Sequence, residues 1–118
     1  MATLKWGKAY LFDRYAGRLH EEPGGRFVFT YDDSYLESKA PAIAHTLPLQ
    51  TKPHISEHAL HPFFDNLVAE GWLQNAQARA LGVDPSNRFA LLLGFGVDLI
   101  GAISIIDPEP EPRPHLDH

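Results

Sequence analysis

Apolar and polar residues alternate with a period of two in the first third of the chain, which predicts antiparallel strands. We expect strands over Lys8–Phe12, Tyr15–His20 and Arg26–Tyr31. The run Glu22-Pro23-Gly24-Gly25 is a strong turn signal between the last two of them. Phe27, Phe29 and Tyr31 share one face of the third strand, and three aromatic residues on one face predict a core-facing surface.

After residue 61 the pattern changes to a helical period. One stripe holds the apolar residues Phe63, Phe64, Leu67 and Val68, and the other face holds Asp65, Asn66 and Glu70. Pro62 suits the first turn of this helix, since a first-turn residue needs no backbone N–H. Gly71 suits a left-handed exit from it. The run His61–Gly71 therefore predicts one complete short helix with its stop signal.

Two further helices and two further extended segments complete the pattern. A second helix is expected from Trp72 or Leu73 to Leu81, ended by Gly82, and a third from a cap at Asp84 through Phe89–Leu93 to Gly94. Thr46–Leu49 is expected to be briefly extended, and Leu99–Ile106 to be a central strand, because apolar residues occupy both of its faces. The segment 35–44 is less regular, and Pro41 argues against a central strand there.

These elements predict an α+β fold with an antiparallel sheet of about five strands and three short helices. Residues 1–107 are expected to form one domain, since 118 residues allow a single modest core. Residues 108–118 are rich in Pro and Glu, so they are expected to form a flexible tail.

Trp72 has two interpretations. If Gly71 ends a helix, the indole can pack back on the last turn of that helix near Leu67 as a hydrophobic clasp. Alternatively, it is an exposed anchor between two helices, where a tryptophan fills a pocket of a partner protein. Local pattern favours neither interpretation.

Composition and charge exclude several classes of function. The formal charge is −5 with no cluster of Lys or Arg, which argues against direct nucleic-acid binding. No apolar run approaches the roughly 18 residues of a membrane span, and the first residues lack the apolar stretch of a secretory signal. The absence of cysteine removes disulfides and thiolate chemistry. We therefore expect a cytoplasmic protein.

Candidate chemistry is sparse. His54, His58 and His61 would align on one helix and could then hold zinc, but Pro62 pushes His61 away from helical angles and no fourth ligand is evident. Exposed or loop-packing histidines explain them better. The serines lack an elbow motif or a paired base, so no nucleophilic triad is predicted. We expect no catalytic residues, no metal ligands and no cofactor, and hence no enzyme.

Several motifs, in order, resemble the N-terminal subdomain of the HipA family, the bacterial serine/threonine kinases of toxin–antitoxin systems. They run from residue 8 to residue 107. The motifs are Ala9-Tyr10-Leu11-Phe12, Tyr15-Ala16-Gly17-Arg18-Leu19, Phe27–Tyr31 with Tyr35-Leu36, Leu47-Pro48-Leu49, His61–Leu67 with Glu70-Gly71, Phe89-Ala90-Leu91-Leu92, and Gly101-Ala102.

The resemblance has departures that change what it implies. Ala69 stands where the family usually has a proline, and Gly96-Val97-Asp98 stands where paired glycines often precede the aspartate. The ATP loop, catalytic aspartate and metal ligands of a full HipA kinase do not occur here, so no kinase activity is carried over. A free-standing domain of this size is similar to the HipS-like antitoxins of three-gene HipBST systems.

The resemblance implies an antitoxin that binds and inhibits a HipT-like kinase, with a HipB-like helix-turn-helix protein as a further partner. The residues expected to contact the kinase are Glu70, Gly71, Trp72 and Leu73. Pro62, Phe63, Phe64 and Leu67 are expected to hold the helix to the sheet. The alternatives are a non-inhibitory scaffold between kinase and DNA-binding subunit, a metal-binding protein using the three histidines, and a small hydrolase, for which the sequence names no acid–base pair.

Overall fold

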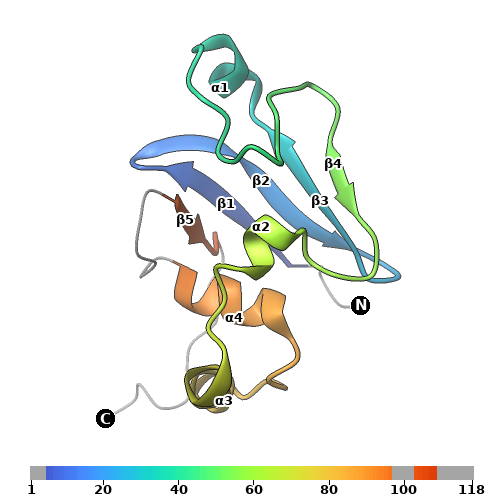
Figure 1. Ribbon diagram of the computed structural model, residues 1–118, viewed down its shortest axis with the longest axis vertical. Coiled ribbons are helices and arrows are strands. Elements are labelled where there is room, and N and C mark those ends of the chain that lie inside the picture. The colour runs from blue at the N-terminus through green and yellow to red at the C-terminus, as the bar shows by residue number, and fades with distance from the viewer. Residues whose placement is uncertain (1–4, 97–102, 109–118) are drawn as a thin grey trace.

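The computed structural model describes residues 5–96 and 103–108 and contains a five-stranded antiparallel sheet (Figure 1). The strands are β1 Trp6–Leu11, β2 Arg14–Glu22, β3 Arg26–Tyr31, β4 His54–Ser56 and β5 Ile103–Ile106. Their order is β4-β3-β2-β1-β5, so the first three strands form a meander in the middle of the sheet. The α+β class and the five strands are as the sequence predicts.

The aromatic face of β3 is core, as the alternation predicts. Phe29 and Tyr31 are each 2% exposed, and Phe27 packs against the same cluster from a half-buried position. The turn before β3 contains Gly24 and Gly25 with φ of 90° and 82°, angles that glycine adopts at little cost. The turn signal at residues 22–25 is therefore confirmed.

The fourth strand lies at His54–Ser56, and the prediction of an extended piece at Thr46–Leu49 is wrong beyond an isolated bridge between Ala44 and Leu47. Leu47 is fully buried, and its carbonyl accepts a hydrogen bond from the Tyr31 hydroxyl. The apolar side chain of Leu47 therefore anchors a loop to the core. The sequence pattern alone does not distinguish such a loop from a short strand.

The last strand, β5, lies at the edge of the sheet and pairs only with β1 among the described residues. The prediction of a central strand is wrong in this respect. Ile103 and Ile105 face the core, whereas Ser104 and Ile106 stay half-exposed. The predicted residues 99–102 of this strand lie outside the described residues, as does the predicted tail from residue 109.

The described chain contains four helices, one more than predicted. They are α1 Asp33–Glu37, α2 Pro62–Asp65, α3 Gly71–Leu81 and α4 Arg88–Phe95. The additional helix, α1, overlaps the start of the segment 35–44, for which an irregular structure is expected. The side chain of Asp32 caps this helix by accepting from the backbone N–H of Ser34 at 3.1 Å. Its single turn is too short to produce a readable helical period.

Helix boundaries depart from the sequence pattern at two places. Helix α2 ends at Asp65 with Asn66 as its C-cap, and Gly71 begins α3 instead of ending α2. Helix α4 is capped by Asn87 instead of Asp84, and it continues through Gly94 to Phe95. By contrast, α3 ends before Gly82 as predicted, with that glycine at φ 73°.

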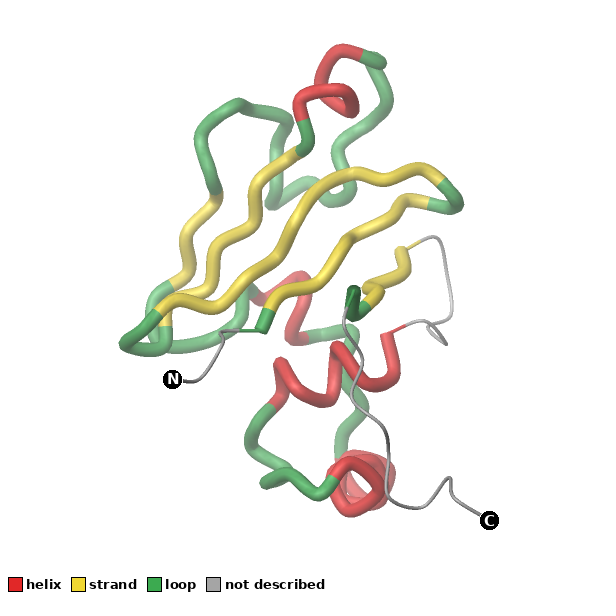
Figure 2. The backbone as a smooth tube through the Cα atoms, turned by 180° about the vertical axis from the view of Figure 1, so that it is seen from behind, coloured by secondary structure: helices red, strands yellow, loops and turns green. Residues whose placement is uncertain are grey.

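Helices α2 and α4 cover one face of the sheet, whereas Figure 2 shows the strands from behind with no described helix lying across them. The core between sheet and helices is built from fully or almost fully buried apolar side chains. Among these are Leu19, Phe29, Phe64, Leu91, Leu92 and Ile105. Within the described ranges, no helix has the length and apolar character needed to cross a membrane.

Candidate functional site

Trp72 and Leu73 are exposed apolar side chains in the first turn of α3. Trp72 is 80% exposed and Leu73 is 40% exposed. The clasp interpretation of Trp72 is wrong, because α2 ends six residues before Gly71 and the indole is in solvent instead of packed on a helix. Of the two interpretations open from the sequence, the exposed position required of an anchor is the one observed.

Gly71 sets the direction in which the chain enters α3. Its φ is 67°, a left-handed conformation that side chains other than glycine rarely adopt, and a Cβ atom at this position would meet nothing within 4 Å. The requirement for glycine is therefore conformational. Glu70 precedes it as an extended N-cap with no side-chain cap bond, and its carboxylate is 80% exposed near the positive end of the helix dipole.

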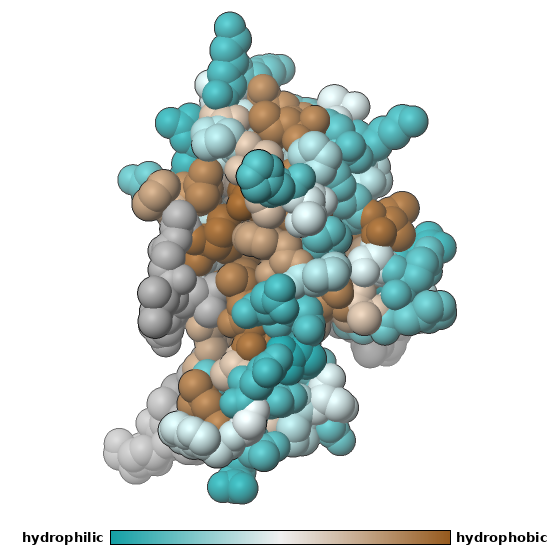
Figure 3. Space-filling view, viewed as in Figure 1, coloured by the Kyte–Doolittle hydropathy of each residue, from teal (hydrophilic) through white to brown (hydrophobic). Residues whose placement is uncertain are grey.

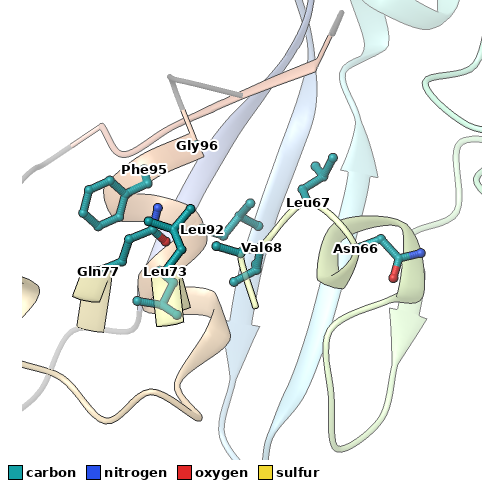
Figure 4. A pocket seen from close by; sticks show the side chains of 10 residues that line it. Asn66, Leu67, Val68, Leu73, Gln77, Leu92, Phe95 and Gly96 are labelled. Atoms are coloured by element: carbon teal, nitrogen blue, oxygen red, sulfur yellow. The ribbon is translucent and has the colours of Figure 1, made fainter. Parts of the chain in front are cut away.

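A cavity of about 430 Å³ lies beside this turn, between α3, α4 and the loop that follows α2 (Figure 4). Its lining is Asn66, Leu67, Val68, Ala69, Leu73, Gln77, Leu91, Leu92, Phe95 and Gly96. Leu73 belongs both to this lining and to the exposed surface next to Trp72. In Figure 3, apolar surface gathers near the centre of this face of the molecule, where the sheet meets the helices. Adjacent exposed apolar side chains beside an apolar cavity are typical of an interaction surface.

Arg88, the first residue of α4, holds the loop between α2 and α3. Its Nε donates to Asp65 Oδ1 at 2.5 Å, and its Nη2 donates to the backbone carbonyls of Asp65 at 2.9 Å and Val68 at 3.3 Å. The Glu70 carboxylate lies 3.9 Å from the same nitrogen. The Arg88 side chain is only 21% exposed, so these contacts are partly shielded from water. The residues leading to Trp72 are thus fixed to α4.

Sequence reasoning missed this contact. The helical pattern placed Asp65 on a face pointing away from the core, whereas the structure joins it to α4 through Arg88. A signal is nevertheless present, because Arg88 is the only charged residue between Asp84 and Asp98. A cation in the first turn of a helix opposes the helix dipole, so it requires a specific partner.

The four residues expected to hold the helix to the sheet have different environments. Phe64 is fully buried, and its ring centroid lies 5.4 Å from that of Phe29. Phe63 and Leu67 are half-buried against the core, and Leu67 also lines the cavity. Pro62 is exposed at the first position of α2. Phe64 is therefore the main contact of α2 with the sheet.

The three histidines do not share a helix. His54 lies on β4, His58 has φ 70° in the loop after it, and His61 is the N-cap of α2. His54 Nε2 lies 2.8 Å from the carbonyl oxygen of Pro48, and His61 Nδ1 accepts from the backbone N–H of Phe63 at 3.1 Å. Within the part of the chain that the structure describes, no group of three His, Cys, Asp or Glu residues is placed to hold a metal ion.

Burial lowers the pKa of His61, and the nearby His54 lowers it further. A hydrogen bond with the backbone of Thr46 acts in the opposite direction. The neutral imidazole is favoured because its Nδ1 serves as an acceptor for the helix N-terminus. His61 is thus a capping residue in this fold.

Sequence comparison finds relatives of two sizes. An uncharacterized protein of Haemophilus influenzae is 33% identical over 102 residues, which cover 86% of this chain and 92% of that protein. Two Sinorhizobium fredii proteins, named "Putative kinase Y4mE" and "Putative kinase Y4dM", are 35% and 34% identical over 84% and 85% of this chain. The match covers only 24% and 28% of those two proteins, so this chain spans about a quarter of their length.

Solved structures with the same fold are also found. The N-terminal domain of HipA toxin has a TM-score of 0.71 and 29% identity, and the match covers 94% of this chain and 99% of that domain. The HipA, HipB and operator DNA complex of the Shewanella oneidensis toxin–antitoxin system also gives a TM-score of 0.71. Its matching chain is 24% identical, with 98% of this chain and 26% of that chain covered, which shows a shared fold.

The model of the HipA N-terminal domain family matches residues 7–106, from the second residue of β1 to the last residue of β5. The match thus includes all of the sheet except Trp6, as well as Arg88 and the turn that exposes Trp72. The chain belongs to the HipA N-terminal domain family.

Proposed function

We propose that this chain is an antitoxin that binds a HipT-like serine/threonine kinase and inhibits it, without catalysis of its own. The observation that carries the proposal is the exposure of Trp72, which is 80% in solvent and directly precedes Leu73 of the cavity lining. Tryptophan is among the residues that most often dominate protein interfaces. The two Sinorhizobium proteins support a kinase as the partner, since their names describe kinases and this domain matches about a quarter of each.

The inhibition is proposed to occur by exclusion. A kinase must close a loop over ATP and position its metal ions before phosphate is transferred. An indole inserted into that cleft prevents closure and costs little entropy, because tryptophan has only two side-chain torsions. Gly71 directs the turn, Leu73 extends the apolar contact, and the exposed carboxylate of Glu70 is available to a cation on the kinase.

The test is a binding and inhibition assay with a purified HipT-like kinase from the same genome. Trp72→Ala is expected to weaken binding by about 2–4 kcal/mol, or about 30- to 900-fold, and to restore phosphotransfer at an inhibitor concentration that is sufficient for the unchanged chain. Ile55→Ala is the matched control, since Ile55 is a 52% exposed apolar residue on β4. Full neutralisation by a folded Trp72→Ala chain would overturn the role of the indole.

The same assay separates inhibition from scaffolding. A scaffold that links the kinase to a HipB-like DNA-binding subunit would bind the kinase without changing its rate of phosphotransfer. Inhibition by the chain alone supports an antitoxin, whereas inhibition that requires the HipB-like subunit supports a ternary complex. Unchanged activity with tight binding would replace the antitoxin proposal by the scaffold.

A further inference from the structure

Two residues other than glycine adopt left-handed backbone angles on either side of one hollow. Phe12 has φ 56° in the two-residue turn between β1 and β2, and Lys39 has φ 64° after the end of α1. Such angles are uncommon outside glycine, asparagine and aspartate, and they are most strained for bulky residues. Backbone strain of this kind concentrates at functional sites.

The ring of Phe12 does not explain its own position. It is 74% exposed, so it adds little to the core. Hairpin turns with left-handed residues favour Gly or Asn, and phenylalanine offers neither their conformational freedom nor their hydrogen bonds. Both stability and turn chemistry therefore argue for a different residue here.

The hollow next to Phe12 measures about 460 Å³. It is lined by residues 11–14 of the hairpin and residues 38–41 of the loop after α1. The loop is held in place by the buried Tyr35, whose hydroxyl donates to the Pro41 carbonyl at 2.6 Å and whose own carbonyl accepts from Ser38 Oγ at 2.7 Å. The hollow is thus formed before any ligand arrives.

Two cations border this hollow. Arg14 and Lys39 are both exposed, and neither has a carboxylate partner in the described part of the chain. Asp13 supplies the single carboxylate of the lining. On a chain with a formal charge of −5, a site with an excess of positive charge stands out from its surroundings.

We propose that this hollow is a second interaction surface, which binds an acidic segment of a partner polypeptide. An apolar side chain of that segment would pack on Phe12, and its carboxylates would pair with Arg14 and Lys39. The surface is separate from the site at Trp72, since the two linings share no residue and α4 lies between the sheet and α3 (Figure 1).

The test uses the full chain labelled with ¹⁵N and a short peptide in which glutamates flank a leucine–phenylalanine pair. Shifts of amide signals are expected at residues 11–14 and 38–41, and a lysine-flanked peptide of the same apolar centre is expected to cause none. Phe12→Asn is expected to weaken peptide binding about tenfold or more, because the contact with the ring is lost. Its melting temperature should not fall, because asparagine tolerates the left-handed angle.

Three controls make the outcome decisive. Phe12→Tyr keeps the ring and should retain binding, and the double change Arg14→Glu with Lys39→Glu should weaken it about tenfold or more. Trp72→Ala should leave peptide binding unchanged, so failure here is distinguishable from failure of the kinase proposal. No shifts with the acidic peptide, or tighter binding of an oligothymidylate to the same residues, would overturn the assignment.

Discussion

Arg88 is a cation placed where a helix disfavours one, and its partners explain the placement. Arg88 forms a clamp on the end of α2 and the loop after it. It donates to the carbonyl of Asp65, which also accepts from the backbone N–H of Val68 at 3.1 Å, and to the carbonyl of Val68. It adds an ion pair with the Asp65 carboxylate. The fixed loop then delivers Gly71 and Trp72 to solvent. Arg88 therefore positions the residues of the candidate site, although it is not part of the exposed surface itself.

Replacing Arg88 by methionine is expected to lower the free energy of unfolding by about 1–3 kcal/mol, because the carbonyls and the carboxylate lose a charged donor. Arg26→Met is the matched control. Arg26 pairs with Glu22 and Glu57, but its side chain is 45% exposed, so its loss should cost less than about 1 kcal/mol. Urea unfolding of both variants measures the difference, and equal effects would contradict the clamp.

His61 makes the stability of the fold depend on pH. The folded chain lowers the pKa of His61 below its ordinary value of 6.5, so the unfolded chain binds the proton more readily. The contribution of His61 to stability is complete above about pH 6.5 and declines as the pH falls through the window below it. Protonation also removes the acceptor that caps α2.

We therefore expect the free energy of unfolding to decrease between about pH 7 and pH 5. His61→Asn supplies a capping oxygen that does not titrate in this range, so its decrease should be smaller. Denaturant titrations of both proteins at about pH 7 and pH 5 measure how much unfolding free energy each one loses. An identical decrease in both proteins would show that His61 does not contribute.

At the scale of elements, strong local signals were sufficient for some boundaries and not for others. The hairpin from β2 to β3 follows from alternation and two glycines, and α3 ends at Gly82 as its sequence indicates. Gly71 has a positive φ, as Gly82 does, yet Gly71 begins a helix whereas Gly82 follows the end of one. A glycine in the sequence can indicate a position with positive φ. It does not indicate whether the helix precedes or follows that position, because tertiary contacts decide this.

Some features of the candidate site can likewise be predicted from the sequence, and others cannot. Residues 70–73 are a prediction from a resemblance, and glycine followed by tryptophan is visible in the sequence. The cavity could not be predicted, because it forms between α3, α4 and the loop after α2. Strand order was also beyond sequence reasoning, since β4 is a three-residue edge strand and β5 pairs with a distant partner.

The contact of α4 with β5 predicts unequal effects of two glycine substitutions. A Cβ atom at Gly96 would lie 2.7 Å from the backbone oxygen of Ile105, whereas one at Gly94 would lie 2.6 Å from the terminal methyl Cδ1 of Leu81. The backbone of Ile105 cannot move away as easily as the terminal methyl of Leu81. Gly96→Ala is therefore expected to lower the unfolding free energy by about 1–3 kcal/mol.

For Gly94→Ala, rotation of Leu81 relieves the contact, and alanine adds up to about 1 kcal/mol of helix propensity. Its net effect should be smaller than that of Gly96→Ala. Thermal or denaturant unfolding of the two variants gives the comparison. A larger loss at Gly94 would mean that the α3–α4 contact is less adaptable than the one at β5.

At the scale of the whole molecule, the core and the two proposed interaction surfaces occupy different regions. The core joins the sheet to α2 and α4 on one face. The cavity near the exposed tryptophan is lined by residues of α3 and α4, whereas the hollow at Phe12 lies between the β1–β2 turn and the loop after α1. Under the two proposals above, the domain contacts its two partners through separate surfaces and without rearranging its core.

The pairing of β1 with β5 also has a consequence for the order in which the chain folds. Lys8 and Ile106 are neighbours in the sheet, although almost the whole described chain lies between them. Such a distant contact is formed late, because a long loop must close before it is gained. On the ribosome, the meander from β1 to β3 is complete early, but the outer edge of β1 stays open to other chains until β5 has been synthesised.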